Sequence, residues 1–361
     1  MRGPLGRLCG QLLVVGLAGR TLSTAERDAF AQGERGGVVL FKRNVGAPEE
    51  VAGLVRSLCE ATDAPLVAID QEGGRVVRIG PPALALPPMR RIGDLGDADL
   101  ARRLAAAQAR ELRALGITMS FAPVADVASN PDNPVIGDRA FASSPAEVAR
   151  FAAAWAEGLA QGGVLACAKH APGHGDTSVD SHLALPRVER TRAGLEEIEL
   201  VPFRALARHP DVHAMMSAHV VYPALDPERP ATLSRRIATD LVRGELGFAG
   251  VLFSDDLEMK AIQLPIGEAA VLAVQAGCDA LLVCSRADLA EEALAALVRE
   301  AERSDAFRAR CEEASTRLRA LRGRVTPAPA ASRQALDDVF AGSNAVATEL
   351  ARRLEEGRSI S

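Results

Sequence analysis

Lysine is nearly absent from this chain. Only Lys42, Lys169 and Lys260 occur among 42 basic residues, so almost every surface cation is an arginine. A lysine at the end of an apolar run is therefore a candidate for a specific role. Net positive charge is also missing: the formal net charge is -5. With no basic stripe along the chain, nucleic acid is not expected as the main partner.

Cysteine pairs and long apolar runs are missing as well. The six cysteines form no CxxC pair, and Cys167, Cys278 and Cys284 lie in or beside apolar segments. Reduced core thiols in a cytoplasmic protein are the favoured interpretation. No apolar run reaches membrane-spanning length, so no membrane partner is expected. The short, glycine-broken run at residues 11–19 favours a first strand over a signal peptide.

What the chain does contain is a repeated alternation of short apolar runs and longer Ala/Leu/Arg/Glu stretches. Apolar residues make up 48% of the chain, enough for a substantial core. The alternation predicts βαβ units around a parallel sheet. Eight such units in about 280 residues favour a (β/α)8 barrel of the TIM type over an open doubly wound sheet. The eight predicted strands are Leu12–Val15, Gly37–Phe41, Leu66–Ile69, Thr118–Pro123, Val164–Lys169, Ala214–Ala218, Val251–Ser254 and Ala280–Cys284.

Helical periodicity fills most of the intervals and all of the C-terminal part. The predicted helices include Ala98–Leu115, Pro145–Gln161, Thr191–Ala207 and Ile266–Ala276. After residue 285 the pattern predicts helix over Ala287–Leu321, a linker at Pro327–Ala331 and a last helix near Gln334–Glu356, with no further strand. We therefore expect a single barrel domain over residues 1–325, followed by a helical extension over 326–361.

The most informative segment is KHAPGHGDTSVDSH, residues 169–182. It holds three of the six histidines, and the apolar run Val164–Ala168 leads directly into it. A buried strand that ends in a polar, glycine-punctuated loop is how α/β barrels build an active site. Other strand ends are also polar: DQEGGR (70–75) follows the third strand, Asp126 and Arg139 follow the fourth, His219 the sixth, and Asp255 and Asp256 the seventh.

The blocks DQEGGR, KHAPGHGDTSVDSH and FSDDLEMK (253–260) resemble family 3 glycoside hydrolases, in this order and spacing. Within that family they are similar to the bacterial cytoplasmic β-N-acetylglucosaminidases of peptidoglycan recycling. The resemblance covers about Gly10 to Cys284. Two positions depart from the pattern: Ala171 stands where an aromatic residue is usual, and the residues after Leu257 often differ.

The resemblance implies Asp255 as the nucleophile of a retaining glycosidase and a histidine–aspartate pair, His182 and Asp180, as the acid and base. Because successive strand residues point to opposite faces, only one of Asp255 and Asp256 is expected to face the barrel mouth. Asp256 is then the candidate helix N-cap. An imidazole titrates near neutrality and suits proton transfer, and Gly173 and Gly175 are expected to let the loop swing.

The resemblance also implies that the terminal N-acetylglucosamine is bound by charged side chains, namely Asp70, Arg78, Arg139, Lys169 and His170. The implied reaction releases terminal non-reducing N-acetylglucosamine with retention, without cofactor or metal. The implied substrate is a small muropeptide fragment, N-acetylglucosamine linked to anhydro-N-acetylmuramic acid. His174, Asp176 and Glu72 are expected to shape the loops, and His219 either lines the pocket or belongs to the core.

Four alternatives stay open at the level of sequence. A phosphorylase could use the same residues, because a histidine acid does not repel phosphate. A metal-dependent hydrolase could use the histidines and aspartates as ligands, although their spacing fits no standard zinc pattern. The acetamido oxygen could act as the nucleophile beside Asp255 and Asp256. A catalytically dead sugar-binding module is disfavoured because both proposed catalytic groups are present.

Overall fold

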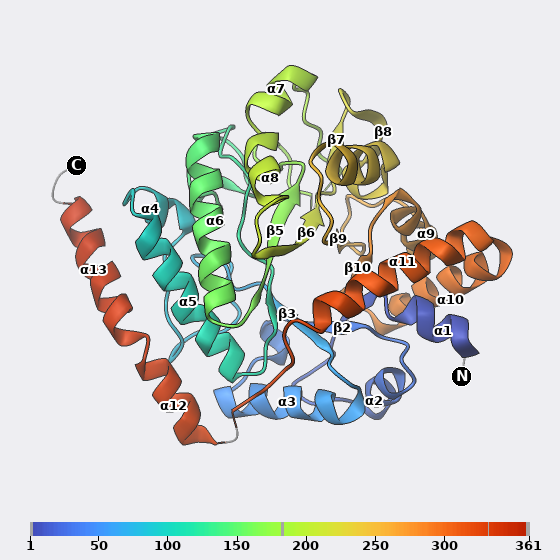
Figure 1. Cartoon of the computed structure of the whole chain (residues 1–361), viewed down its shortest axis with the longest axis horizontal. Helices are drawn as coiled ribbons and strands as arrows, with labels where there is room; N and C mark the ends of the chain where they lie inside the picture. The colour runs from blue at the N-terminus through green and yellow to red at the C-terminus, as the bar shows by residue number, and fades with distance from the viewer. Residues whose placement is uncertain (1–2, 182–183, 331, 359–361) are drawn as a thin grey trace.

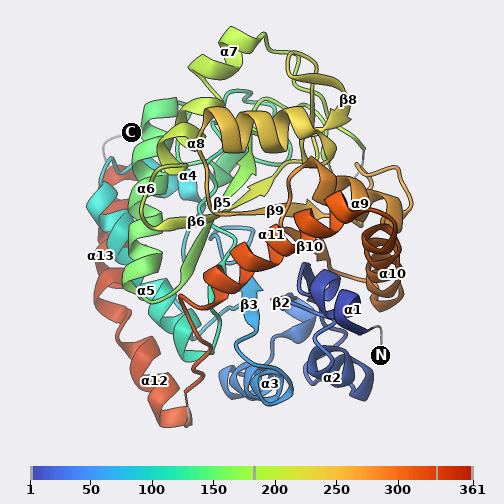
Figure 2. The same cartoon turned by 45° about the vertical axis from the view of Figure 1, so that its right-hand side comes forward.

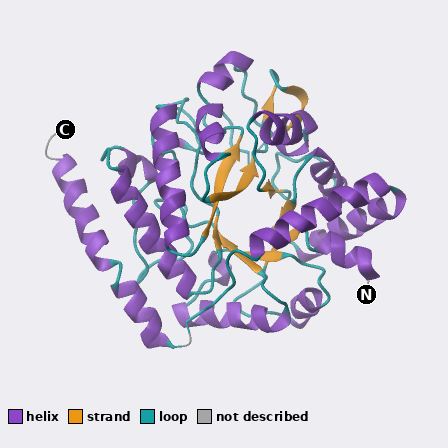
Figure 3. Ribbon diagram, viewed as in Figure 1, coloured by secondary structure: helices purple, strands orange, loops and turns teal. Residues whose placement is uncertain are grey.

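The computed structural model describes residues 3–181, 184–330 and 332–358. Eight parallel strands form a closed barrel in the order β1-β10-β9-β6-β5-β4-β3-β2, surrounded by helices (Figures 1 and 3). The barrel strands are β1 (Leu13–Gly16), β2 (Gly37–Leu40), β3 (Leu66–Ile69), β4 (Met119–Ser120), β5 (Leu165–Ala171), β6 (Val212–Ser217), β9 (Val251–Asp256) and β10 (Ala280–Val283). The predicted (β/α)8 barrel and all eight predicted strands are confirmed.

The barrel closes because β1 pairs with the last strand. Leu13 aligns with Leu281 and Val15 with Val283. Nearly every strand residue is buried, as expected when helices cover the outside and side chains fill the inside. In the core, the Phe121 and Phe253 rings meet edge to face at 5.6 Å. The barrel is therefore a packed scaffold, and its open chemistry is confined to the strand ends.

Helices follow the strands as the alternation predicted. They are α2 (Thr24–Ala31), α3 (Pro48–Ala61), α4 (Met89–Gly93), α5 (Ala98–Ala114), α6 (Pro145–Gln161), α7 (Arg192–Glu197), α8 (Leu200–Leu206), a π-helix over Arg236–Glu245, α9 (Ile266–Ala276) and α10 (Ala287–Arg303). Three elements have no counterpart in the sequence analysis: the N-terminal helix α1 (Gly3–Gly10) and the antiparallel pair β7 (Val221–Tyr222) and β8 (Asp226–Pro230).

Three predicted helices are each divided in two. Thr191–Ala207 becomes α7 and α8, because Pro202 lacks the amide that a continuous helix needs and its ring would clash with the preceding turn. Ala287–Leu321 becomes α10 and α11 (Asp305–Arg322), where the Ser304 hydroxyl accepts from the Phe307 amide and starts α11. Gln334–Glu356 becomes α12 (Arg333–Ala341) and α13 (Asn344–Arg358).

The two C-terminal helices lie against the outside of the barrel. Helix α12 contacts α3 and α5, and α13 runs along α5, far from the N-terminus (Figures 1 and 2). Arg103 of α5 pairs with both oxygens of Glu349, and Ser343 donates to the buried Glu111 carboxylate at 2.5 Å. In the described residues after 285 there is no strand, as predicted. The division of the chain at residue 325 stays a prediction.

None of the described helices combines the length and apolar character needed to cross a membrane. All six cysteines are unpaired, and five of them are buried.

A buried charge cluster lies at the amino end of β10, around Asp279. Its carboxylate is fully buried and binds Arg243 at 2.5 Å, Arg310 at 2.7 Å and Arg317 at 3.2 Å. It also accepts from the Leu252 amide at 3.0 Å. A single carboxylate thus joins the π-helix and α11 to the strands.

We expect Asp279→Asn to lower the free energy of unfolding by about 3–5 kcal/mol, because three partly buried arginines lose their counter-charge. Denaturant unfolding followed by circular dichroism measures this change. The control is Asp288→Asn: Asp288 is 64% exposed and pairs with exposed Arg286. Because solvent screens an exposed pair of this kind, its loss should leave the unfolding midpoint close to that of the wild type. Equal denaturant midpoints of unfolding for the two variants would show that the buried cluster does not stabilise the packing of α11 on the barrel.

Candidate active site

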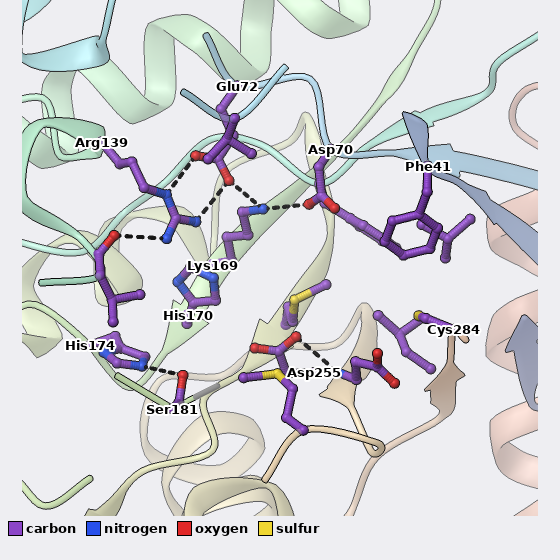
Figure 4. A pocket seen from close by; sticks show the side chains of 18 of the residues that line it. Phe41, Asp70, Glu72, Arg139, Lys169, His170, His174, Ser181, Asp255 and Cys284 are labelled. Atoms are coloured by element: carbon purple, nitrogen blue, oxygen red, sulfur yellow. Dashed lines mark hydrogen bonds and ion pairs between the residues drawn. The ribbon is translucent and has the colours of Figure 1, made fainter. Parts of the chain in front are cut away.

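A cavity of about 360 Å³ opens at the carboxyl ends of the strands. Its volume lies within the range of about 300–1,000 Å³ usual for ligand pockets. Valine, phenylalanine, methionine and leucine side chains form part of the wall, including Phe41 after β2. Cys284 and ten polar or charged residues line the rest; the ten are Asp70, Glu72, Arg78, Arg139, Lys169, His170, His174, Ser181, Asp255 and Asp256. All five predicted sugar-binding residues and Asp255 therefore meet in one cavity (Figure 4).

The centre of the charged wall is Lys169, which lies in β5 and is only 3% exposed. Its Nζ lies 2.8 Å from Asp70 Oδ1 and 2.6 Å from Glu72 Oε1. Arg139 binds both Glu72 oxygens at 2.8 Å, and Arg78 binds Asp70 Oδ2 at 3.1 Å. Lys169 is thus not a surface charge, as its rarity suggested. Glu72, expected only to shape its loop, is a full member of this network.

Burial opposes the ionisation of these groups, but their partners outweigh it. The pKa of Asp70 is lowered by Lys169 and Arg78, and the pKa of Glu72 is lowered well below its usual value by Arg139 and Lys169. The pKa of Lys169 is raised by the same two carboxylates. All stay charged at neutral pH. Carboxylates that accept and cations that donate are the pairing that sugar hydroxyls require.

A second group lies behind His170. His170 Nδ1 is 2.7 Å from Asp126 Oδ2, and the Asp126 carboxylate is fully buried. The neighbouring ring of His174 is also buried, with its nitrogens at 2.8 Å from Thr177 Oγ1 and 3.1 Å from Ser181 Oγ. Burial lowers the pKa of His174 to about 4, so this ring is neutral at pH 7. His174 is a structural support for the loop, as expected.

The loop after β5 is tied down over its described part. Asn133 Nδ2 donates to the carbonyls of His174 and Gly175 at 2.9 and 3.0 Å, and the Tyr222 hydroxyl donates to Gly173 O at 2.6 Å. A Cβ on Gly175 would lie 1.6 Å from the Val127 carbonyl oxygen, so only glycine fits there. Close packing thus explains Gly175 directly; the predicted swing of the loop stays a prediction.

The loop returns to the cavity at Ser181. This residue lines the cavity, and its carbonyl accepts from the Ala261 amide at 3.3 Å, beyond the strand that carries Asp255. Asp176, earlier in the loop, pairs with Arg190 at 2.7 Å. Asp180 is partly buried and its carbonyl accepts from the Ala184 amide at 3.0 Å. His182, the predicted acid, lies outside the described residues.

At the end of β9, the two adjacent aspartates both line the cavity. This differs from the expectation that only one of them faces the mouth. Asp255 Oδ1 accepts from the Asp256 amide at 2.8 Å, and Asp256 Oδ1 accepts from the Glu258 amide at 3.1 Å. Asp256 therefore closes a turn and is not a helix N-cap, because the next helix, α9, begins only at Ile266.

The two carboxyl groups differ in their ionisation. Burial opposes charge on Asp255, but His219, His170, Lys169 and the Asp256 amide lower its pKa below the usual value. Burial raises the pKa of Asp256 to about 7, and the charges of Glu258 and Asp255 add to this effect. Asp255 is thus a carboxylate at neutral pH, while Asp256 is near the midpoint of its titration.

His219 belongs to the core beneath the site and does not line the cavity. Its side chain is fully buried, with Nε2 3.0 Å from the Asp256 carbonyl and Nδ1 2.8 Å from Thr232 Oγ1. The sequence left both placements open. Among the described residues, no group of three or more His, Cys, Asp or Glu side chains could hold a metal ion.

A barrel with adjacent carboxyl groups at one strand end, opposite a wall suited to hydroxyls, has the architecture of a glycoside hydrolase. Comparison with protein families supports this class: residues 6–321 match the model of the glycosyl hydrolase family 3 N-terminal domain. The chain belongs to this family, and the resemblance seen in its motifs is confirmed.

The curated relatives of this chain include β-hexosaminidases. The chain is 43% identical over 282 residues to a β-hexosaminidase of Alkalilimnicola ehrlichii, covering 76% of this chain and 80% of the relative. A family 3 β-N-acetylglucosaminidase from Paenibacillus sp. FPU-7 has a similar structure, with TM-score 0.85 and 40% identity, over 93% of this chain and 67% of that one. NagZ from Neisseria gonorrhoeae, in complex with N-trifluoroacetyl-D-glucosamine, gives TM-score 0.73 and 33% identity over 85% and 98% of the chains. The predicted enzyme class, a glycoside hydrolase of the β-N-acetylhexosaminidase type, is confirmed.

The raised pKa of Asp256 predicts a pH dependence of stability. The folded protein holds the Asp256 proton more tightly than the unfolded chain does. The stability that this proton provides is therefore fully present below about pH 4 and is lost as the pH rises through about 7. Asp256→Asn removes this loss. We therefore expect the variant to gain stability over the wild type between pH 5 and pH 8, measured by thermal unfolding at each pH.

The control for this experiment is Asp240→Asn, at an exposed aspartate on the outer π-helix. Its curve should run parallel to that of the wild type. A parallel curve for Asp256→Asn as well would contradict the assigned titration.

Proposed function

We propose that this enzyme releases terminal, non-reducing β-linked N-acetylglucosamine with retention of configuration, through a covalent glycosyl–Asp255 intermediate. The observation that carries the proposal is the position of Asp255: an ionised carboxylate at the end of β9, in the same cavity as the charged wall around Lys169. The names of the relatives support the choice of sugar.

In the proposed mechanism, Asp255 attacks the anomeric carbon, the glycosidic bond breaks and a glycosyl ester forms. Water then attacks the same carbon, which releases the sugar with retention and regenerates the Asp255 carboxylate. The Asp256 amide donates to Asp255 Oδ1, which orients the attacking carboxylate. Burial opposes its ionisation, but His219, His170, Lys169 and the Asp256 amide hold the pKa of Asp255 below its usual value. Burial raises the pKa of Asp256 to about 7, which favours a neutral carboxyl group beside the charged nucleophile.

The proton for the leaving oxygen comes from His182, with Asp180 as its partner. Support for this assignment is indirect: Ser181, which lies between the two in sequence, lines the cavity and is held by His174 and by the Ala261 amide. A histidine with a carboxylate partner suits general acid and base catalysis near neutral pH.

The sugar itself is bound by Asp70, Arg78, Arg139, Lys169 and His170. Three cations, Lys169, Arg78 and Arg139, face two carboxylates, Asp70 and Glu72, so this wall has a net positive charge. The hydroxyls of a neutral sugar can donate hydrogen bonds to Asp70 and accept hydrogen bonds from the three cations. We propose a muropeptide fragment ending in anhydro-N-acetylmuramic acid as the substrate, in the recycling of peptidoglycan, and the cytoplasm as the location.

Asp255→Ala tests the nucleophile. We expect turnover of an aryl N-acetyl-β-glucosaminide to fall by at least about 1,000-fold, because no other described carboxylate is assigned to attack. The control is Asp240→Ala on the outer surface, which should retain the wild-type rate. In wild-type reactions, proton NMR should show the β-anomer of N-acetylglucosamine first. An α-anomer first, wild-type turnover by Asp255→Ala, or formation of the 1-phosphate whenever phosphate is added would each contradict the proposed hydrolysis.

His182→Ala tests the acid. We expect a loss of about 100-fold or more in kcat/KM for substrates with poor leaving groups, because these need a proton on the departing oxygen. A dinitrophenyl leaving group needs no proton and should lose little. The measurement is kcat/KM across aryl glycosides of increasing phenol pKa. A uniform loss across the series would remove His182 from the role of acid.

A further inference from the structure

Asp126 is a fully buried carboxylate behind the wall of the cavity, and the mechanism above does not use it. It follows β4 and is outside the set of residues that line the cavity. The chain beside it is joined to β5: Val124 pairs with Lys169, and the Ala125 amide donates to Lys169 O at 2.7 Å. A buried carboxylate needs partners to offset its desolvation, and Asp126 finds all of its hydrogen bonds in one place.

Three hydrogen bonds reach Asp126, and all come from two histidines of the loop segment. Oδ2 is 2.7 Å from His170 Nδ1, while Oδ1 accepts from the His170 amide at 3.2 Å and from the His174 amide at 2.7 Å. A single carboxylate thus holds the ring of a cavity-lining residue and the backbone where the catalytic loop begins.

The pairing decides which ring nitrogen of His170 faces the cavity. Burial opposes charge on Asp126, but the two histidines lower its pKa, so it is ionised and can only accept hydrogen bonds. His170 Nδ1 must therefore carry a hydrogen. The free nitrogen, Nε2, is left for the cavity, where His170 stands between Lys169 and Asp255 (Figure 4).

The effect of His170 extends to the nucleophile. Electrostatic interaction with His170 is one of the causes of the lowered pKa of Asp255. The orientation of this ring therefore matters for the attacking carboxylate, and its tautomer decides whether Nε2 accepts from or donates to a sugar hydroxyl. A carboxylate that holds an imidazole in one tautomer is a known device for orienting a functional histidine.

We propose that Asp126 is a positioning residue that acts through His170: it fixes the tautomer and orientation of the ring that contacts the glycone, and separately anchors the start of the loop at His174. The inference rests on the proposed function in two respects: the contact of His170 with the glycone and the assignment of the acid to the loop after His174. The tautomer itself can be measured without any turnover.

Asp126→Asn separates the two tasks. Its Oδ1 can still accept from the His170 and His174 amides, while its Nδ2 faces His170 Nδ1 and donates to it. We expect His170 to change tautomer, and kcat/KM to fall by about 10- to 100-fold. Because the change is on the glycone side, the loss should be equal for aryl glycosides with good and poor leaving groups, unlike the loss in His182→Ala.

The spectroscopic test uses 15N NMR of the histidine rings. In the wild type, the His170 signals, assigned by their absence in His170→Gln, should show hydrogen on Nδ1. In Asp126→Asn the hydrogen should be on Nε2. An unchanged tautomer in Asp126→Asn would overturn the proposal, whatever the activity of the variant. If Asp255→Ala instead disproved the proposed mechanism, the tautomer assigned by NMR would still stand.

A double-mutant cycle tests whether Asp126 acts through His170. If it does, Asp126→Asn combined with His170→Gln should lower kcat/KM no further than His170→Gln alone. Multiplied losses in the double variant would show that Asp126 acts by another route and would overturn the proposal.

Asp126→Ala tests the anchor at His174. Losing both oxygens should add a dependence on the leaving group to the loss seen with Asp126→Asn, because the loop that leads to Asp180 loses its first attachment. The matched control is Asp226→Ala on β8, outside the cavity: that carboxylate also accepts three hydrogen bonds, from the amides of Glu228 and Arg229 and the Ser234 hydroxyl. It should keep wild-type kcat/KM. An equal loss in Asp226→Ala would show general destabilisation and would overturn the role of Asp126 as the anchor.

Discussion

The ion pairs of Lys169 are the interaction on which the rest of the site depends. A buried ammonium group is unfavourable unless its charge is compensated, and here Asp70 and Glu72 compensate it from the loop after β3. Arg139 then satisfies Glu72 from the loop after β4. Glu72 is the member shared by Lys169 and Arg139, so its removal would leave Arg139 without a carboxylate and Lys169 with Asp70 alone. The loops after β3 and β4 are therefore held against β5 in one arrangement, and the wall that faces the substrate is formed before the substrate arrives.

Behind this wall is a second layer of contacts that no substrate reaches. Asn133 and Tyr222 hold the carbonyls of the loop after β5, and Asp126 holds its amides. On the other side of the cavity, Asp255 is part of β9 and thus of the barrel itself. In the proposed mechanism the nucleophile is fixed by the scaffold and the acid is carried by a loop. That division suits a reaction in which the acid has to approach only after the sugar is bound.

Much of the architecture could be predicted because its causes are local. Each barrel strand is buried on both faces, which gives a short apolar run that is visible without any partner. The breaks between helices were harder to predict. The break between α7 and α8 has a local cause, Pro202. The turn between α12 and α13, at Gly342 and Ser343, instead places Ser343 against Glu111, 232 positions away in the chain. The short β7 and β8 pair has too few residues to show a period. The region after residue 325 was predicted to be helical, and its packing on α5 was not.

For the site, the sequence determined which residues meet, because polar side chains at the carboxyl ends of parallel strands must share one rim of a closed barrel. The strand ends marked a larger set of polar residues as candidates, and the resemblance to family 3 glycoside hydrolases selected Asp70, Arg78, Arg139, Lys169, His170 and Asp255 from it. Only the tertiary structure decided the pairings: Glu72 with Lys169, Asp126 with His170, and Asp256 facing the cavity beside Asp255. Pairings of this kind depend on strand register and on differences of a few ångströms between loops, which are set by the packing of the whole barrel and leave no mark on the local pattern of residues.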